Sequence, residues 1–413
     1  MNKQTTQRLF VFTLSAVILL MLVTGCAKEE EEILIGAPIP ITGPYASDGE
    51  LMKMALDMAI EEINAEGGLL GRPVRLVVAD VGGLEAEKIK AAGERLIGED
   101  VHAIITGYDD GGVDTHVFGA YDVPYLHCNA MSLSTQPVAE NPDYWNVFQY
   151  CANEVAYGID ASTKLFEIPA EMGWTPPNKK VAIVKVDYAY NIMAADEFRD
   201  RITPQGYEVV VDEVTQFGVV EWGPILSKIE ETEPSYITFW NLDPSDAARF
   251  MIQLREHFGD AGFEALVFMQ YTPAIPEFLE LAGESAEGLI WVTDVAPWGK
   301  GVGEYTQRWI DEYDEEPKGV YAYATRDGFD IWAKAVEQAG CVDCYEEIAD
   351  NIRNIYHEGL CANYQFTDDD QSAVVGDDLA PVVWHQIWDG ESRITWPANQ
   401  KEWDYQIPPW IPQ

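Results

Sequence analysis

The sequence predicts an α/β protein with two doubly wound lobes, and three features carry this prediction. Short apolar runs alternate with amphipathic helical patterns, as in parallel sheets covered by helices. The alternation begins near residue 33, is interrupted near residue 150 and restarts near residue 181. The chain has 413 residues, of which 47% are hydrophobic, and this suffices for more than one core. Two successive βαβ arrays therefore imply two lobes.

Each array contains four expected strands that alternate with helices. Buried strands are indicated by apolar runs bounded by turn residues, and helices by apolar residues at helical spacing. The expected strands are 33–39, 74–79, 102–106 and 124–128 in the first array, and 181–186, 208–214, 236–240 and 265–269 in the second. The expected helices are 49–65, 85–97, 191–202, 222–230, 245–258 and 328–338.

This topology also predicts where a ligand binds. Ligands of doubly wound sheets lie at the carboxyl ends of the strands, so two facing lobes create a cleft between them. The architecture is that of a binder that closes around a hinge.

The N-terminal segment has the features of an export signal. Lys3 and Arg8 precede an apolar run over 9–23, which is too short to span a membrane. The run ends in Val-Thr-Gly-Cys at 23–26, which resembles the bacterial lipobox in which Cys26 is diacylated. We expect a lipoprotein signal peptide at 1–25, a charged acylated tether at 26–32, an extracytoplasmic location and membrane contact through the lipid anchor only.

The chain is strongly acidic. It has 26 Lys and Arg against 70 Asp and Glu, a formal net charge of -44. Such a surface repels phosphates, so nucleic acid is excluded as a partner. We interpret the excess of acids as a solvated charged surface of the protein.

Five cysteines remain after Cys26 in a compartment where disulfides persist. Disulfides are expected from Cys341 or Cys344 to Cys361, and from Cys128 to Cys151. The Cys341-Val-Asp-Cys344 motif has redox spacing, but it follows a helix rather than a strand, so a structural role is favoured.

The sequence offers little for an enzyme. G-x-S-x-G, H-E-x-x-H and Walker motifs are absent, and the six histidines lack metal-ligand spacing. The acidic segments 368–370 and 377–378 lack the spacing of a calcium loop, and we expect a solvated β-hairpin over 364–387 instead. No catalytic residue, metal site or cofactor is expected.

Two stretches, IGAPIPITGP at 35–44 and INAEGGLLGRPV at 63–74, resemble the Leu/Ile/Val-binding family of type I periplasmic solute-binding proteins. The resemblance implies a receptor that closes over a small polar solute, such as an amino acid, amide or amine, and delivers it to ABC permease subunits. It also implies three crossovers, placed here near Cys151, Val295 and Gly359. The lobes would then be 33–151 plus 296–358, and 152–295 plus 359–413. A second reading is a sensor of the same fold that signals through a protein partner.

The resemblance further implies where the solute is held. In the family, hydroxyls and backbone amides of lobe 1 hold an amino acid's carboxylate, and an acid of lobe 2 holds its ammonium. This sequence departs from the pattern, because Asp109 and Asp110 stand in the first turn and Asp48 stands where an aromatic residue is common. Acids repel a carboxylate, so lobe 1 is expected to present Asp48, Asp109 or Asp110 to a cationic or hydrogen-bond-donating head group. Aromatic residues of lobe 2 are expected to cover the rest of the solute.

The alternatives stay open. Asp109 or Asp110 can instead cap a helix or complete a turn, and Trp240 and Trp298 can be packing residues. The full set of candidate ligand-binding residues is Asp48, Tyr108, Asp109, Asp110, Asn129, Ala130, Met131, Tyr188, Tyr190, Trp240, Asn241, Gln270, Tyr271 and Trp298.

Overall fold

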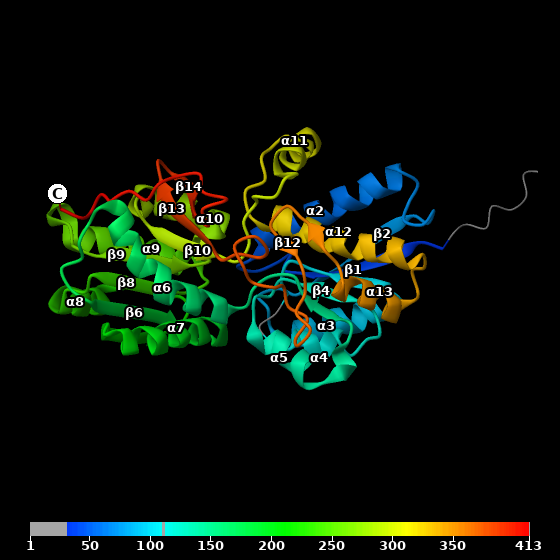
Figure 1. The fold of residues 1–413 in the computed structure, drawn as a ribbon, viewed down its shortest axis with the longest axis horizontal. Coiled ribbons are helices and arrows are strands. Elements are labelled where there is room, and N and C mark those ends of the chain that lie inside the picture. Colours follow the sequence, from blue (N-terminus) through cyan, green and yellow to red (C-terminus); the bar gives the residue numbers. More distant parts are fainter. Residues whose placement is uncertain (1–30, 110–111, 413) are drawn as a thin grey trace, which may run out of the picture.

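The computed structural model describes residues 31–109 and 112–412, which form two lobes side by side (Figure 1). The expected signal peptide, Cys26 and Asp110 lie outside the described residues. No described helix combines the length and the apolar character that a membrane crossing would need.

The first lobe is built on a five-stranded parallel sheet in the order β2-β1-β3-β4-β5. The four strands expected in this array are confirmed. The fifth strand, β5, is not among the expected strands, because its two apolar residues, Val147 and Phe148, stand between the polar Asn146 and Gln149. The strands are β1 (Ile33–Ile39), β2 (Val74–Asp80), β3 (Ala103–Ile105), β4 (Tyr125–His127) and β5 (Val147–Gln149).

Helices cover both faces of this sheet, and α12 packs against α2. The helix α2 begins at Ala46, before the expected residue 49. Gly49, in its first turn, lies directly against Pro40, which follows β1. A Cβ atom on Gly49 would lie 2.0 Å from the Pro40 carbonyl oxygen, so only glycine allows this approach. The helices are α2 (Ala46–Ala65), α3 (Ala86–Gly98), α4 (Asp114–Phe118), α5 (Ser132–Glu140), α11 (Val302–Tyr313), α12 (Tyr321–Ala339) and α13 (Tyr345–Arg353).

The second lobe is built on a seven-stranded sheet in the order β14-β13-β10-β9-β8-β6-β7. The pairs among β6 to β10 are parallel, whereas β13 and β14 form an antiparallel edge. The strands are β6 (Lys180–Val186), β7 (Glu208–Thr215), β8 (Tyr236–Trp240), β9 (Leu266–Gln270), β10 (Ile290–Thr293), β13 (Val383–Trp388) and β14 (Glu391–Trp396). The helices are α6 (Glu154–Met172), α7 (Ala189–Ile202), α8 (Gly223–Thr232), α9 (Pro244–Phe258) and α10 (Pro276–Ala282).

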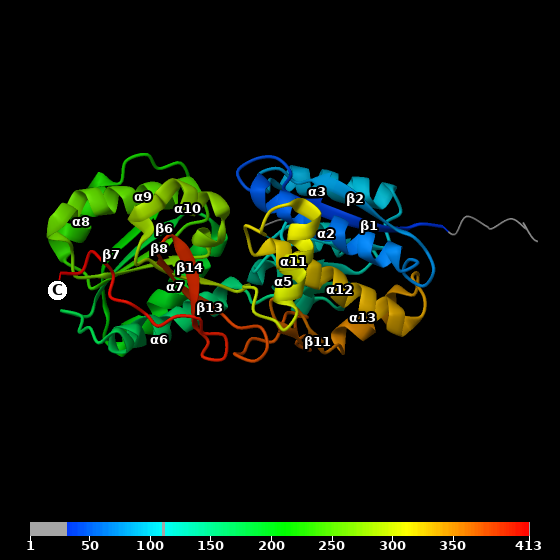
Figure 2. The same cartoon turned by 90° about the horizontal axis from the view of Figure 1, so that it is seen from above.

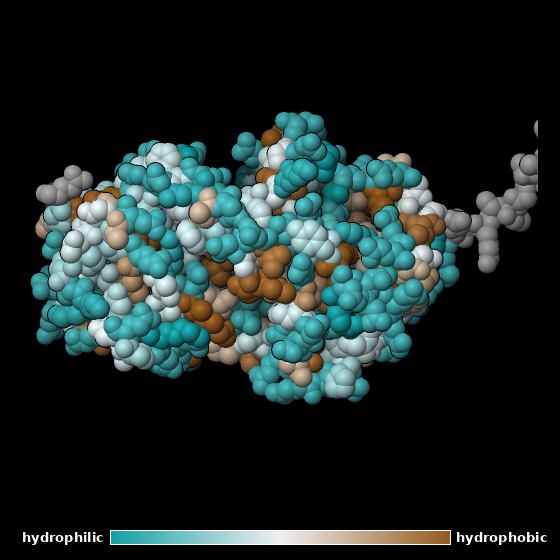
Figure 3. Space-filling view, viewed as in Figure 1, coloured by the Kyte–Doolittle hydropathy of each residue, from teal (hydrophilic) through white to brown (hydrophobic). Residues whose placement is uncertain are grey.

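The helix α11 stands out from the first lobe beside the junction (Figures 1 and 2). Tyr305 donates a hydrogen bond from it to the Ala322 carbonyl of α12, and Tyr313 donates one to the Met54 carbonyl of α2. The face seen in Figure 3 is mostly hydrophilic, and its hydrophobic residues gather mainly near the junction of the lobes.

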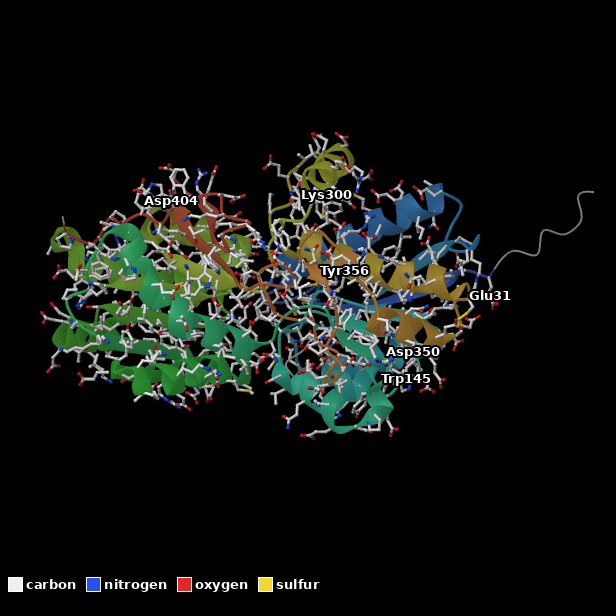
Figure 4. The ribbon with its side chains drawn as sticks, in the orientation of Figure 1. Glu31, Trp145, Lys300, Asp350, Tyr356 and Asp404 are labelled. Carbon is white, nitrogen blue, oxygen red and sulfur yellow. A yellow bond between two sulfur atoms is a disulfide. The ribbon has the colours of Figure 1, made fainter. Side chains whose placement is uncertain are left out.

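The third passage between the lobes lies later in the chain than the expected Gly359. Short strands β11 (His357–Glu358) and β12 (Asn363–Tyr364) precede it, and the Gln149 main chain of β5 exchanges hydrogen bonds with Gln371 and Ala373. The Arg353 side chain also joins Gln371 to the Trp145 carbonyl, on the side of the lobe where Figure 4 labels Trp145 and Asp350. The chain therefore crosses between residues 373 and 383.

The expected solvated hairpin over 364–387 is wrong for the same reason. Phe366 bridges Ala373 and Val375 bridges Ala380, so the segment forms two small loops. Residues Tyr364 and Phe366 are buried because they pack into the core, while β13 pairs with β10 and β14 in the other lobe.

The expected disulfide pairing is also wrong. Cys341 and Cys344 are bonded to each other, whereas Cys128, Cys151 and Cys361 are free and buried. Cys361 cannot reach the pair at the end of α12, because its main-chain N–H is held by Asp327 within that helix. The sulfur atoms of Cys128 and Cys151 lie within 4.8 Å of each other but are not bonded.

Candidate functional site

A pocket lies between the two lobes and receives residues from both. Its empty space, counted out to the open mouth, is about 470 Å³. Six of its twelve lining residues are tyrosines, so aromatic rings form half of the lining. The lining residues are Tyr45, Leu84, Tyr108, Asn129, Ala130, Met131 and Tyr321 from lobe 1, and Tyr188, Tyr190, Leu242, Tyr271 and Asp294 from lobe 2.

Most of the lining residues follow the carboxyl ends of parallel strands, as the fold predicts. Tyr108 follows β3, and the turn Asn129–Met131 follows β4. In lobe 2, Tyr271 follows β9 and Asp294 follows β10. Seven candidates from the sequence line the pocket: Tyr108, Asn129, Ala130, Met131, Tyr188, Tyr190 and Tyr271.

Three turns of the pocket hold non-glycine residues in the left-handed region. Leu84 has a φ of 68°, and Ala130 and Tyr271 each have a φ of 56°. Such conformations cost of order 1–3 kcal/mol and cluster at ligand-binding sites, where the surrounding structure holds them in place. All three are lining residues, so the backbone is shaped to present this wall.

Asp48 does not line the pocket, contrary to the expectation. It is 1% exposed in the first turn of α2, behind the tyrosine wall. Its Oδ2 atom accepts hydrogen bonds from the hydroxyls of Tyr108 at 2.8 Å and Tyr271 at 2.9 Å. Burial raises the pKa of Asp48 to about 6, while these two hydrogen bonds oppose the rise. Because Tyr271 belongs to the other lobe, Asp48 joins the two lobes.

Asp109 does not line the pocket either. It is fully buried and accepts hydrogen bonds from the Tyr125 hydroxyl at 2.9 and 3.1 Å. Its main-chain N–H donates to Asn129 Oδ1 at 3.0 Å, and Asn129 Nδ2 donates to the buried Asp114 at 2.8 Å. The carboxylates therefore hold the turn below the pocket, which agrees with the alternative of a turn residue.

Four further candidates lie outside the pocket wall, namely Trp240, Asn241, Gln270 and Trp298. Trp240 is in the core, where its indole N–H donates to Thr238, and Asn241 Oδ1 accepts from the Asp243 main chain. The main-chain N–H of Trp298 donates to the Leu360 carbonyl.

Gln270 lies behind the wall and supports it. Its Nε2 donates to the Tyr190 hydroxyl at 2.7 Å, so it acts through that tyrosine.

Sequence reasoning missed five lining residues: Tyr45, Leu84, Leu242, Asp294 and Tyr321. A signal existed for Asp294, because it directly follows the apolar run 289–293 at a strand's carboxyl end. Leu84 and Leu242 carry no such signal, because an isolated leucine in a loop is common.

Asp294 is the only acid among the lining residues that the structure describes. The Tyr157 hydroxyl donates to its Oδ1 at 2.5 Å and accepts from its main-chain N–H at 2.8 Å. Its Oδ2 atom is buried without a hydrogen-bond partner among the described residues. Burial raises the pKa of Asp294 to about 6.

Two described groups bring potential metal ligands close together. A carboxylate oxygen of Asp294 and the sulfurs of Cys128 and Cys151 lie within 4.8 Å of one another. The other group contains Cys341, Cys344 and Glu347, whose two sulfurs are already joined in the disulfide. Soft ligands such as thiolates suit zinc or copper. Of these two groups, only the first contains cysteines that are not in a disulfide.

The comparisons agree with this geometry. A model of the periplasmic binding protein family matches residues 32–382. The chain belongs to this family. The expected Leu/Ile/Val-binding resemblance and the type I fold are thereby confirmed. The Leu/Ile/Val-binding protein homolog 2 of Brucella abortus (strain 2308) is 24% identical over 318 residues, which cover 76% of this chain and 81% of that relative.

Solved structures of periplasmic binding proteins show the same fold. A putative branched-chain amino acid ABC transporter protein from Silicibacter pomeroyi has a TM-score of 0.84 at 28% identity and covers 92% of this chain and 100% of its own. The substrate binding protein LivJ from Streptococcus pneumoniae, in complex with isoleucine, has a TM-score of 0.70 at 19% identity and covers 88% of this chain and 98% of its own.

Proposed function

We propose that this periplasmic binding protein is the extracytoplasmic solute-binding lipoprotein of an ABC importer. It captures a small polar solute, such as an amino acid, amide or amine, by hinge closure and delivers it to the permease. The observation that carries the proposal is the interlobe pocket, whose wall combines residues of both lobes. A solute in such a pocket contacts both lobes and stabilises the closed form by its differential affinity for that form.

Binding rather than catalysis is supported by the lining residues. Among the described residues of the wall there is no serine, cysteine, histidine or lysine that could act as a nucleophile or its base. His127 lies behind the wall, where it stacks on Tyr125 and where burial lowers its pKa to about 3.

A thermal-shift screen of residues 27–413 tests the proposal. The panel contains amino acids, amides, amines, betaines, polyamines and small carboxylates. A solute present at a hundred times its Kd adds about 2.7 kcal/mol to the stability of the folded state, so a clear rise in Tm is expected.

Leu242→Trp fills the pocket and is expected to abolish the rise. Leu281→Trp is the matched control, because Leu281 is 51% exposed in α10 of the same lobe. Absence of any rise across the panel, or an equal rise in both variants, contradicts the proposal.

The lipid anchor rests on the lipobox at 23–26. We expect labelled palmitate to be incorporated into the full chain in a bacterial host, and Cys26→Ala to lose the label. Ser227→Ala is a control for expression, because Ser227 is exposed in α8 and the variant leaves the lipobox intact. Labelling that persists in Cys26→Ala would contradict the anchor.

A further inference from the structure

We propose that Asp294 is the charge partner of the solute, and that the pocket selects organic ammonium compounds over amino acids and carboxylates. The inference rests on the proposed function, since it names the solute class of the same site. It differs from the interpretation made from the sequence, which assigned this role to acids of lobe 1. Four observations support it.

The first observation is the unpartnered oxygen of Asp294. The residue is 4% exposed, and Tyr157 engages its Oδ1 and its main-chain N–H. Its Oδ2 atom meets no donor at hydrogen-bond geometry among the described residues, and the Cys151 thiol that lies near the carboxylate is a weak donor. A buried charged acceptor without a partner is strongly unfavourable. A donor that arrives with the solute satisfies this oxygen.

The second observation is that the solute must bring the positive charge itself. The described lining residues include no lysine, arginine or histidine. An ammonium group is therefore the available cation for Asp294, and its N–H groups form short, charge-assisted hydrogen bonds to a carboxylate.

The third observation is that the turn after β4 is poorly suited to a carboxylate. The Ser132 main-chain N–H donates to the buried Glu154 at 2.6 Å, and the Met131 N–H donates to Gln149 Oε1 at 3.3 Å. These two main-chain donors of the turn are thus used within the protein and are not available to an anion. Asp48 and Glu154 add negative charge behind the wall, and like charges repel in a partly desolvated site.

The fourth observation is the continuous aromatic wall. The ring of Tyr108 packs edge-on against Tyr45 and Tyr321, with centroids 6.0 and 4.9 Å away, and Tyr321 packs against Tyr271 at 6.4 Å. Aromatic faces attract organic cations by about 0.5–2 kcal/mol each and also cover an aliphatic tail. The wall therefore suits a cation with an apolar substituent.

The test uses four small molecules that share one branched chain. Leucine carries both charges, 3-methylbutylamine lacks the carboxylate, 4-methylpentanoate lacks the ammonium, and 3-methylbutanol is uncharged. Binding to residues 27–413 is measured by isothermal titration at neutral pH. We expect 3-methylbutylamine to bind more tightly than leucine, and 4-methylpentanoate not to bind.

Asp294→Asn is expected to weaken binding of the amine by about 10- to 100-fold. The variant is also expected to reduce the preference for the amine over the alcohol. Partial unfolding of the variant cannot cause this change, because loss of folded protein affects the binding of both molecules equally. Asp160→Asn is the matched control. Asp160 is another acid whose pKa is raised to about 6 by burial, but it accepts from the Trp384 indole away from the pocket.

Two results overturn the inference. One is that 3-methylbutylamine fails to bind the wild-type protein or binds more weakly than leucine. The other is that the amine-to-alcohol preference is unchanged in Asp294→Asn. Binding of leucine or another solute leaves the proposed solute-binding function standing in either case, so the two failures are distinguishable.

Discussion

Replacing Asp48 by alanine is expected to open the two lobes of the ligand-free protein. Asp48 Oδ2 accepts one hydroxyl from its own lobe, Tyr108, and one from the other lobe, Tyr271. A hydrogen bond to a charged group contributes about 1.5–3 kcal/mol, and loss of the acceptor leaves both buried hydroxyls unpaired. Small-angle scattering of residues 27–413 is therefore expected to show a larger radius of gyration.

A matched pair of variants separates closure from local packing. Tyr271→Phe removes the hydrogen bond that crosses the lobes, whereas Tyr108→Phe removes the bond within lobe 1 and leaves the crossing bond in place. We expect the first variant to expand the protein and the second to leave its radius of gyration unchanged. Equal radii for wild type and Asp48→Ala would contradict the role of Asp48.

A second hydrogen bond joins the two lobes besides the bond between Tyr271 and Asp48. Ser47 donates from lobe 1 to Glu277 Oε2 in α10 at 2.8 Å. The double variant Ser47→Ala with Tyr271→Phe is accordingly expected to expand the protein more than Tyr271→Phe alone.

Asp327→Ala is expected to destabilise the fold by about 3–5 kcal/mol. Asp327 is fully buried in α12, and it accepts hydrogen bonds from the main chains of Leu360 at 2.6 Å and Cys361 at 2.8 Å and from the Tyr364 hydroxyl at 2.8 Å. Each buried donor left without an acceptor costs about 1–3 kcal/mol. Urea unfolding of residues 27–413 measures the loss.

The segment around Gly359 packs closely against Asp327 and Tyr364. A Cβ atom on Gly359 would lie 2.5 Å from Tyr364 and 2.8 Å from Asp327. Glu337→Ala, at an exposed position of the same helix, is the control and is expected to change stability by less than about 0.5 kcal/mol. Similar losses in the two variants would contradict the anchoring role.

Asp327 also makes stability depend on pH. Burial raises the pKa of Asp327 from its ordinary 3.8 to about 7, although its three hydrogen bonds oppose the rise. The folded state therefore holds the proton more tightly than the unfolded state, so this stabilisation is complete below pH 3.8 and is lost as the pH rises through about 7. The wild-type protein is expected to lose stability over this window, and Asp327→Ala to show a smaller slope.

Much of the fold could be predicted because its signals are local. The strands β1, β6 and β8 arise from nearly continuous apolar runs. Such runs are typical of parallel strands that are buried on both faces, so they can be found without knowing which strands pair. The strand β5 carries no such signal, because only Val147 and Phe148 are apolar and polar residues flank them. The position of the pocket followed from topology, since turns at the carboxyl ends of parallel strands must meet.

The roles of individual acids could not be predicted in this way. The partners of Asp48 are 60 and 223 residues distant in the chain, and the Tyr125 hydroxyl that holds Asp109 is 16 residues distant. The cysteine pairing failed for a similar reason, because the Asp327 contacts that place Cys361 come from 34 residues away. Residue type and spacing show that an acid is present but not which hydroxyls reach it.

The sequence by itself determined the two-lobed α/β fold, the family and seven of the residues that line the pocket. Only the tertiary structure decided that Asp48 and Asp109 are held by tyrosines while Asp294 keeps an unpartnered oxygen at the wall. The physical reason is that strands and helices arise from patterns within a few residues of one another. The burial and hydrogen bonding of a carboxylate depend on side chains that meet only after the chain has folded.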